Sequence, residues 1–168
     1  PPLAHALRQK FRSGVTIEPI ALSDRSGTIE LRMPVVDGVV VTGCSTVSDN
    51  ASAAYPGYQG IQVPMERLDD VYSGRCGFIK IDVEGYEAEA LRGLSQPVFA
   101  LSIEFVPMVR INAEAALDRL MQLGDYAFNA SYGDDVRLLH PAPLSAEDIR
   151  DWLRSLGDDG PAGDLYAC

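Results

Sequence analysis

The sequence predicts an α/β fold, an open three-layer sandwich with helices on both faces of a mostly parallel sheet. From residue 77 onward, strand-like and helix-like segments alternate, and this order is typical of parallel strands joined by right-handed crossovers. A pair of strand-like segments after residue 124 predicts an antiparallel edge. The length of 168 residues suits one domain with a sizeable core, so we expect residues 1–168 to form a single domain.

The first third of the chain reads as one helix and one hairpin. Residues 3–11 carry apolar side chains at helical spacing directly after a proline, as at a helix start. Residues 15–22 are β-branched and apolar, although Pro19 favours an edge position or a bulge. Turn-forming residues then lead to the alternating pattern of 28–34, which completes the predicted hairpin.

The middle of the chain predicts a long loop that could contain one short strand. Residues 34–62 contain Gly, Ser, Asn and Pro throughout, and loops of this length are usually functional or mobile. A short strand and a turn follow in residues 61–72.

The rest of the chain predicts regular elements. Gly124 stops the second of two amphipathic helices, and a Ser-x-x-Asp pattern at Ser145 caps a third. The predicted strands are 77–83, 98–106, 126–132, 136–140 and 163–168, and the predicted helices are 86–94, 113–123 and 145–156. Residues 133–135 would join two of these strands as a hairpin.

Charge and cysteine content exclude several classes of partner. The formal net charge is −10, so the chain repels phosphate backbones and anionic lipid, and we expect neither nucleic acid nor a membrane as partner. Three cysteines without a CxxC pair argue against disulfides and zinc and favour a reducing compartment. With no apolar run of about 18 residues and no signal peptide, we expect a cytoplasmic location.

Two neighbouring strands end in acidic residues. Asp82 and Glu84 alternate with apolar residues at the end of strand 77–83, and Glu104 ends strand 98–106 in the same way. Ligands of open α/β sheets bind at the carboxyl ends of strands, so the three acids should meet at one rim. Like charges held close together raise at least one pKa, which suits proton abstraction, cation binding or metal binding.

Other roles for these residues stay open from the pattern alone. Glu84 could cap the helix that follows it, and Asp82 and Glu104 could be structural. The position of Lys80 on the same strand favours an internal ion pair for this residue over a role as an amine nucleophile.

The segment "FIKIDVEGYEAEALRGL" at 78–94 closely resembles the signature of the FkbM family of S-adenosylmethionine-dependent methyltransferases. The segments "IEPIALSDRSGTIEL", "QVPMERLDDVY" and "LSIEFVP" are similar to other parts of that family, so the resemblance covers nearly the whole chain. It implies the Rossmann-like class I methyltransferase sheet. It also implies S-adenosylmethionine as cofactor and O-methylation of a hydroxyl on a sugar or natural product.

The resemblance also implies roles for individual residues. Asp82, Glu84 and Gly85 would lie near the methionine moiety of the cofactor and the acceptor, and Glu104 would face the acceptor hydroxyl. The residues that would follow the third strand, beside the adenine, are Ala21, Leu22, Ser23 and Asp24. No metal ligands are implied. The acceptor pocket would be shaped by residues 34–60, with Tyr55 and Tyr58 as candidate stacking surfaces.

The sequence departs from the family pattern at its amino end. A class I site also needs a Gly-rich turn after a first strand and an acidic residue after a second, and neither precedes Pro1. We therefore expect the sheet to lack its first two strands, and the chain on its own to bind the cofactor negligibly.

Three functions remain compatible with the sequence. The first is the methyltransferase, acting on a small-molecule hydroxyl acceptor. The second is a non-catalytic scaffold that pairs an exposed strand edge with another chain, including a second copy of itself. The third is a hydrolase in which Asp82, Glu84 and Glu104 bind Mg²⁺ through oxygen.

Overall fold

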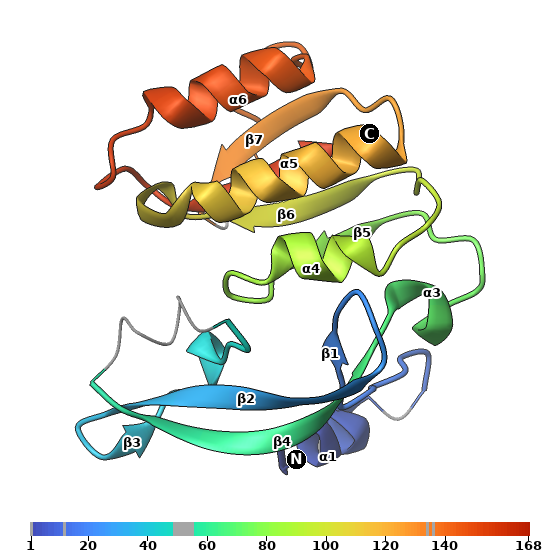
Figure 1. Ribbon diagram of the computed structural model, residues 1–168, viewed down its shortest axis with the longest axis vertical. Coiled ribbons are helices and arrows are strands. Elements are labelled where there is room, and N and C mark those ends of the chain that lie inside the picture. The colour runs from blue at the N-terminus through green and yellow to red at the C-terminus, as the bar shows by residue number, and fades with distance from the viewer. Residues whose placement is uncertain (1, 12, 49–55, 134, 136) are drawn as a thin grey trace.

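The computed structural model describes residues 2–11, 13–48, 56–133, 135 and 137–168. Figure 1 shows two four-stranded mixed sheets together with their helices. The first sheet has the order β1-β4-β2-β3 and the second the order β5-β6-β8-β7. The α/β class predicted from the sequence is confirmed.

A long antiparallel pair forms most of the first sheet. The elements of this half are α1 (Pro2–Lys10), β1 (Ala21–Leu22), β2 (Gly27–Val36), β3 (Val39–Val40), η1 (Thr42–Cys44), β4 (Tyr58–Glu66) and α3 (Leu68–Val71). Strand β2 pairs with β4 from Gly27 opposite Met65 to Pro34 opposite Tyr58. Strand β1 pairs with β4 in parallel.

Two expectations for this half were wrong. The segment 15–22 does not form a hairpin with 28–34: only Ala21 and Leu22 are in a strand, and they pair with β4. Pro19 fits this outcome because it cannot donate a ladder hydrogen bond. The long loop is also shorter than predicted, because β2 extends to Val36 and β4 already begins at Tyr58, whereas β3 is the short strand that the prediction allowed within it. Tyr58 packs its ring against the Arg32 guanidinium at 5.3 Å, and Tyr55 lies outside the described residues.

The second sheet contains the helix-covered core. Its strands are β5 (Ile79–Ile81), β6 (Leu101–Phe105), β7 (Phe128–Tyr132) and β8 (Gly163–Ala167), and its helical elements are α4 (Glu87–Arg92), η2 (Pro107–Val109), α5 (Ile111–Leu123) and α6 (Ala146–Ser155). Ser145 caps α6 as predicted, because its hydroxyl accepts a hydrogen bond from the Asp148 amide at 3.1 Å. Alternate strand residues and the inner helix faces make up the core: Ile81, Leu101, Ile103, Phe105, Leu117, Leu120, Phe128, Ile149, Leu153 and Leu165.

Parallel pairing does not dominate the described strands, contrary to the prediction. Only β1–β4 and β5–β6 are parallel, whereas β2–β3, β2–β4, β6–β8 and β7–β8 are antiparallel. A parallel pair needs a crossover, and α4 supplies one between β5 and β6, but β8 then inserts between β6 and β7. The predicted antiparallel edge is present, and the three-layer Rossmann-like arrangement stays a prediction.

The strand expected at 136–140 is also absent from the described residues 137–140. Leu138 and Leu139 are 51% and 37% exposed, and the segment contacts β7 through the Leu139 amide, which donates to the Ala130 carbonyl oxygen, and through the His140 backbone, which bonds to the Asn129 side chain. Strand β8 pairs with β7 along its whole length and buries Gly163, Leu165 and Ala167 in alternation. Asp134 and Val136 lie outside the described residues.

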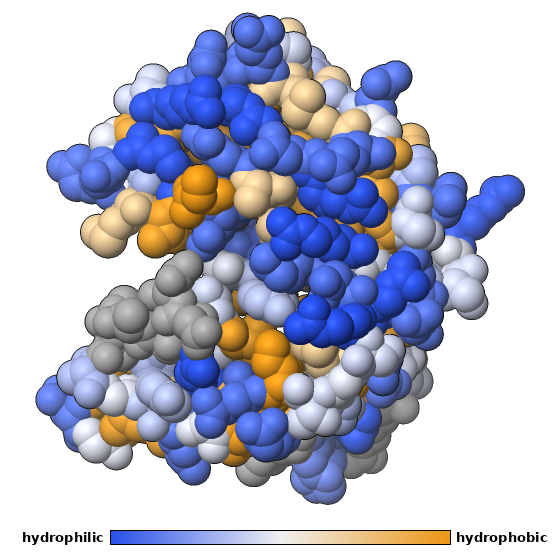
Figure 2. All heavy atoms as spheres, in the orientation of Figure 1, coloured by the Kyte–Doolittle hydropathy of each residue, from blue (hydrophilic) through white to orange (hydrophobic). Residues whose placement is uncertain are grey.

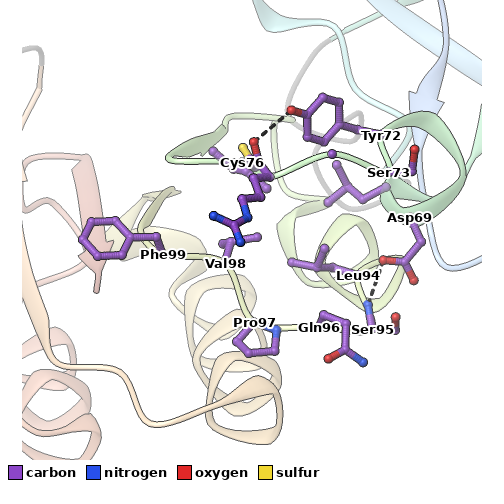
Figure 3. Close-up of a pocket in the computed structure, with 14 residues that line it drawn as sticks. Asp69, Tyr72, Ser73, Cys76, Leu94, Ser95, Gln96, Pro97, Val98 and Phe99 are labelled. Atoms are coloured by element: carbon purple, nitrogen blue, oxygen red, sulfur yellow. Dashed lines mark hydrogen bonds between the residues drawn. The ribbon is translucent and has the colours of Figure 1, made fainter.

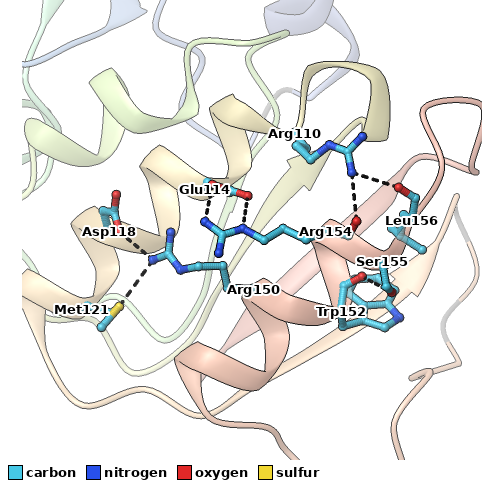
Figure 4. A network of polar contacts seen from close by, with 9 residues as sticks. All are labelled: Arg110, Glu114, Asp118, Met121, Arg150, Trp152, Arg154, Ser155 and Leu156. Carbon is cyan, nitrogen blue, oxygen red and sulfur yellow. Dashed lines mark hydrogen bonds and ion pairs between the residues drawn. The ribbon is translucent and has the colours of Figure 1, made fainter.

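Ion pairs join α5 to α6 along their exposed sides (Figure 4). Arg154 pairs with Glu114 at 2.9 Å, and Arg150 pairs with Asp118 at 2.5 Å. Arg110 donates to the carbonyl oxygens of Arg154 and Leu156 at the end of α6. These contacts satisfy carbonyl groups that have no partner within the helix.

Close backbone contacts connect the two sheets. The Asp69 amide donates to the Gly93 carbonyl oxygen, and the Asp69 carboxylate accepts from the Ser95 amide. A Cβ atom at Gly93 would lie 2.2 Å from the Ser23 carbonyl oxygen, so only glycine allows this approach. At the other end of the second sheet, the Cys168 amide and carbonyl both bond to Ala127. None of the helices in the described part of the chain is long and apolar enough to cross a membrane.

Candidate active site

The acidic residues lie where β5 and β6 end. These two strands are parallel, with Lys80 beside Ser102 and Ile81 beside Ile103, so their carboxyl ends reach the same edge of the sheet. Asp82 follows β5 directly, and Glu104 is the fourth residue of β6. In Figure 1 β6 ends on the left, on the side where the loop between β5 and α4 lies.

A left-handed turn connects β5 to α4. Glu84 has φ +53° and Gly85 has φ +90°, and a residue with a Cβ atom in this conformation costs about 1 kcal/mol. Glu84 does not cap α4, because the helix begins at Glu87 after Tyr86 and has no side-chain cap. Non-glycine residues in this conformation gather at functional sites, so the geometry favours a role for the Glu84 side chain other than capping.

Glu87 holds this turn in place. Its carboxylate accepts hydrogen bonds from the Gly85 amide at 3.0 Å and the Val83 amide at 3.3 Å. The residue is only 2% exposed, and burial raises its pKa, although the bonds from backbone amides oppose that effect. The sequence analysis did not single out Glu87. An acid at the first position of a helix, just after a Glu-Gly turn, is the signal that could have found it.

Thr46 holds the turn from the other sheet. Its hydroxyl donates to the Glu84 carbonyl oxygen at 2.7 Å and accepts from the Ser48 amide at 2.9 Å. Thr46 is 2% exposed and forms a bridge with Arg32 of β2. No sequence pattern marked this residue, because the contact joins segments far apart in the chain.

The three predicted acids do meet. One carboxylate oxygen from each of Asp82, Glu84 and Glu104 lies within 4.8 Å of the others. We call these three residues the acidic rim. Asp82 is exposed, while Glu84 and Glu104 are half-buried.

The acidic rim disfavours full ionisation. Burial raises the pKa of Glu104 from 4.5 to about 7, with further contributions from the charges of Asp82, Glu84 and Glu87. Burial, followed by the charges of Asp82 and Glu87, also raises the pKa of Glu84. Glu104 is therefore poised to gain or lose a proton near neutral pH.

Lys80 has the ion-pair role that its position on the strand predicted. Its ammonium donates to both carboxylate oxygens of Asp164, at 2.7 and 2.9 Å, and lies 3.6 Å from Asp82. Burial alone would lower the pKa of Lys80, but the hydrogen bond and charge of Asp164, followed by those of Asp82, raise it. The rim oxygens are of the kind that a hard cation prefers. A divalent cation bound there would be repelled by this ammonium.

The predicted adenine segment lies in the other sheet. Ala21 and Leu22 form β1, Ser23 is fully buried, and Asp24 is exposed beside Arg25. The Ser23 hydroxyl lies 3.5 Å from the Tyr86 hydroxyl, two residues after Glu84. This contact links the segment to the β5–α4 turn. The Ser23 hydroxyl also donates a hydrogen bond to the Asp24 carboxylate.

A cavity of about 610 Å³ lies at the opposite edge of the second sheet (Figure 3). It is lined by residues that precede β5 and β6, including Tyr72, Cys76, Val98 and Phe99. A second cavity of about 290 Å³ is lined by Phe78, His140, Tyr166 and their neighbours. Neither cavity is lined by a residue that the sequence analysis assigned to the site.

The molecule is hollowed on the side of the acidic rim. Figure 2 shows a hollow on the left, between the part of the molecule that contains β2 and β4 and the part that contains the second sheet. Beyond Glu104, η2 and the first residue of α5 expose apolar side chains: Met108, Val109 and Ile111 are 73%, 40% and 68% exposed. The carboxyl end of β6 thus combines carboxylates with apolar surface.

Comparison with protein families gives one match. A family model described as the methyltransferase FkbM domain matches residues 6–159, which is nearly the whole chain. The chain belongs to the FkbM methyltransferase domain family. Comparisons with curated proteins and with solved structures found no match.

Membership of the FkbM family supports methyltransferase activity and confirms the resemblance seen in the sequence. The usual methyl donor of such enzymes is S-adenosylmethionine, and the residues present fit part of it. The acidic rim suits the sulfonium charge.

Proposed function

We propose that the chain is an S-adenosylmethionine-dependent O-methyltransferase and that the acidic rim is where the acceptor hydroxyl loses its proton. Family membership supports the methyl transfer, and the state of Glu104 supports the choice of a hydroxyl acceptor. The acceptor would be a small molecule such as a sugar or a natural product. S-adenosylmethionine supplies an electrophilic methyl group when it is bound.

Of Asp82 and Glu104, Glu104 is the better candidate for the base that accepts the hydroxyl proton. An alcohol proton needs an acceptor whose pKa lies near the working pH, and that of Glu104 is about 7. Asp82 is exposed and lies beside the Lys80 ammonium, so its charge acts mainly to keep the pKa of Glu104 high. In this proposal Oε1 or Oε2 of Glu104 takes the hydroxyl proton while the acceptor oxygen attacks the methyl group.

The remaining rim residues would position the reactants. Glu84 adds negative charge beside Glu104, which favours a cationic donor over its neutral product. The apolar side chains of Met108 and Ile111 would contact a nonpolar part of the acceptor. The β5–α4 turn, held by Glu87 and Thr46, would keep Glu84 in place without movement during the reaction.

The experiment measures S-adenosylhomocysteine released from S-adenosylmethionine in the presence of a panel of sugars and hydroxylated natural products. It uses a form extended at the amino end, because residues 1–168 on their own are expected to bind the cofactor negligibly. We expect Glu104→Gln to lower turnover at least about 100-fold, as is typical for loss of general base catalysis. Asp82→Asn should lower turnover less, because it removes only a charge that raises the pKa of Glu104. Asp118→Asn makes the same charge change on α5 and should leave turnover unchanged. Wild-type turnover in Glu104→Gln would remove Glu104 from the role of base.

A second candidate function has one observation in its favour. Within the described residues, β5 pairs with β6 on one side and with no strand on the other, and an unpaired edge can add a strand from another chain. We infer that a scaffold of this kind would self-associate or pair with a partner strand. Light scattering at micromolar concentration tests the homo-oligomer, and a stable monomer would count against it.

A further inference from the structure

One face of the second sheet carries a row of charged side chains. Lys80 lies beside Ser102, and Glu104 lies beside Asp164. Residues that are neighbours across a sheet point to the same face, and so do alternate residues along a strand. Lys80, Glu104 and Asp164 therefore share a face, with Glu104 on β6 between the two partners of the ion pair.

The ion pair crosses over the middle strand. The Lys80 ammonium donates to both oxygens of Asp164 on β8, although β5 and β8 are separated by β6. The Asp164 side chain is 14% exposed and that of Lys80 is 49% exposed. Asp164 is the more deeply buried partner, and a buried carboxylate needs a counter-charge, so the ammonium is held firmly on the β8 side.

Glu104 has no such partner. Within the described part of the chain, its carboxylate forms no hydrogen bond and no ion pair, whereas Asp82 and Asp164 both contact Lys80. The Lys80 ammonium does not form an ion pair with Glu104, because it donates two hydrogen bonds to Asp164 instead.

We propose that Asp164 is a positioning residue that holds the Lys80 ammonium away from Glu104 and so leaves Glu104, like Glu84, without a counter-ion among the described residues. The catalytic consequence rests on the proposed function, because it concerns the acceptance of a proton from a hydroxyl. The arrangement itself is testable without cofactor or acceptor.

The charged groups around Glu104 determine the direction in which its pKa should shift when Asp164 is neutralised. Asp82, Glu84 and Glu87 contribute negative charge from β5, the turn and α4, while Lys80 contributes positive charge and Asp164 lies beside Glu104 on β8. When Asp164 is neutral, the ammonium loses its closest partner and moves toward Asp82 and Glu104. A positive charge within about 4–6 Å lowers a carboxyl pKa by roughly one to three units.

The experiment follows the Glu104 side-chain carboxyl by ¹³C NMR between pH 4 and pH 9 in protein labelled at glutamate Cδ. Its resonance is assigned with Glu104→Gln. In Asp164→Asn we expect the titration midpoint of Glu104 to fall by about one pH unit or more. Asp164→Glu should restore the midpoint, and Asp118→Asn, a matched charge change on α5, should not alter it.

A double variant distinguishes two causes of a lower Glu104 midpoint: the relocated Lys80 ammonium and the loss of the Asp164 charge itself. Asp164→Asn with Lys80→Met removes both partners of the ion pair, so neither is left as a charge without its partner, which also favours folding. We expect the Glu104 midpoint to return toward that of the wild type. A midpoint that is unchanged in Asp164→Asn, or that stays low in the double variant, would overturn the proposal. Because no substrate is used, absence of methyl transfer would contradict the proposed function alone.

Discussion

The Thr46 hydroxyl donates a hydrogen bond of 2.7 Å to the carbonyl oxygen of Glu84, 38 residues further along the chain. This bond connects the first sheet with the turn that carries a rim carboxylate. The Thr46 side of the bond is shielded from water, because Thr46 is 2% exposed. The position of Glu84 therefore depends on a segment outside the second sheet.

Thr46→Val tests this connection. The substitution keeps the side-chain shape but leaves the Glu84 carbonyl oxygen and the Ser48 amide without this partner. We expect the free energy of unfolding to fall by about 1–3 kcal/mol, measured by urea denaturation. Thr42→Val is the control at an exposed position of η1 and should change stability by less than about 0.5 kcal/mol.

Glu104→Gln should change how stability depends on pH. The pKa of Glu104 is about 7 in the folded protein against an ordinary value of 4.5, so the folded state binds the proton more tightly. Stability therefore falls as pH rises from about 4.5 through 7, and the wild type carries the full penalty above pH 7. One pKa unit corresponds to about 1.4 kcal/mol, reduced here by solvent screening of a partly exposed group.

We accordingly expect Glu104→Gln to gain about 1–2 kcal/mol over the wild type at pH 8 and almost nothing at pH 4. Thermal denaturation across this range measures the difference. Equal stability of the two proteins at every pH would show that Glu104 titrates normally.

Glu84→Asn should separate stability from function. Asparagine tolerates a positive φ better than glutamate and removes one negative charge from the rim. We expect stability at pH 7.5 to rise by about 0.5–1 kcal/mol while methyl transfer falls. The same change at Glu89, within α4, should destabilise by about 0.5 kcal/mol, because it replaces a good helix former. A less stable Glu84→Asn protein would argue against strain in the turn.

Gly93→Ala tests the close approach of the two sheets. The new methyl group would lie 2.2 Å from the Ser23 carbonyl oxygen and 3.0 Å from the Leu68 amide nitrogen, and neither backbone atom can turn aside. We expect a loss of about 2 kcal/mol or more in urea denaturation. Gly77→Ala, where nothing lies within 4 Å of the added carbon, should be nearly neutral.

Arg110→Ala should loosen the end of α6. The guanidinium satisfies two carbonyl oxygens there and also contacts Asp158, so its removal should cost about 1–2 kcal/mol. Arg92→Ala removes a pair on one exposed helix surface and should cost less than about 0.5 kcal/mol. Similar losses in the two variants would mean that Arg110 acts only as a surface charge.

The acidic rim could be predicted because it depends on local rules. Side chains alternate along a strand, and parallel strands joined by a helix end at the same edge, so Asp82 and Glu104 had to come close once β5 and β6 paired. The ion pair of Lys80 followed from the cost of an unpaired charge on the sheet. Its partner, Asp164, could not be identified, because the position of β8 next to β6 depends on tertiary packing and not on local sequence.

The contacts that hold the turn were not predictable for the same reason. Thr46 lies in a segment that read as a loop, and nothing local relates it to Glu84. Leu138 and Leu139 gave 136–140 a strand-like pattern, yet the described residues of this segment make only isolated backbone bonds to β7, on the edge opposite β8, whereas β8 pairs along the whole length of β7. Propensity alone does not show whether a segment beside a strand forms a full ladder.

Cys168, which directly follows β8, offers a practical site for attaching the protein to a surface. Because β8 runs opposite to β6, Cys168 lies at the edge of the sheet away from the acidic rim, where two backbone hydrogen bonds to Ala127 hold it. Its thiol is exposed, whereas Cys44 and Cys76 are partly covered. Coupling the protein to a sensor chip through Cys168 would leave the carboxylates pointing into solution, ready for immobilised screening of donors and acceptors.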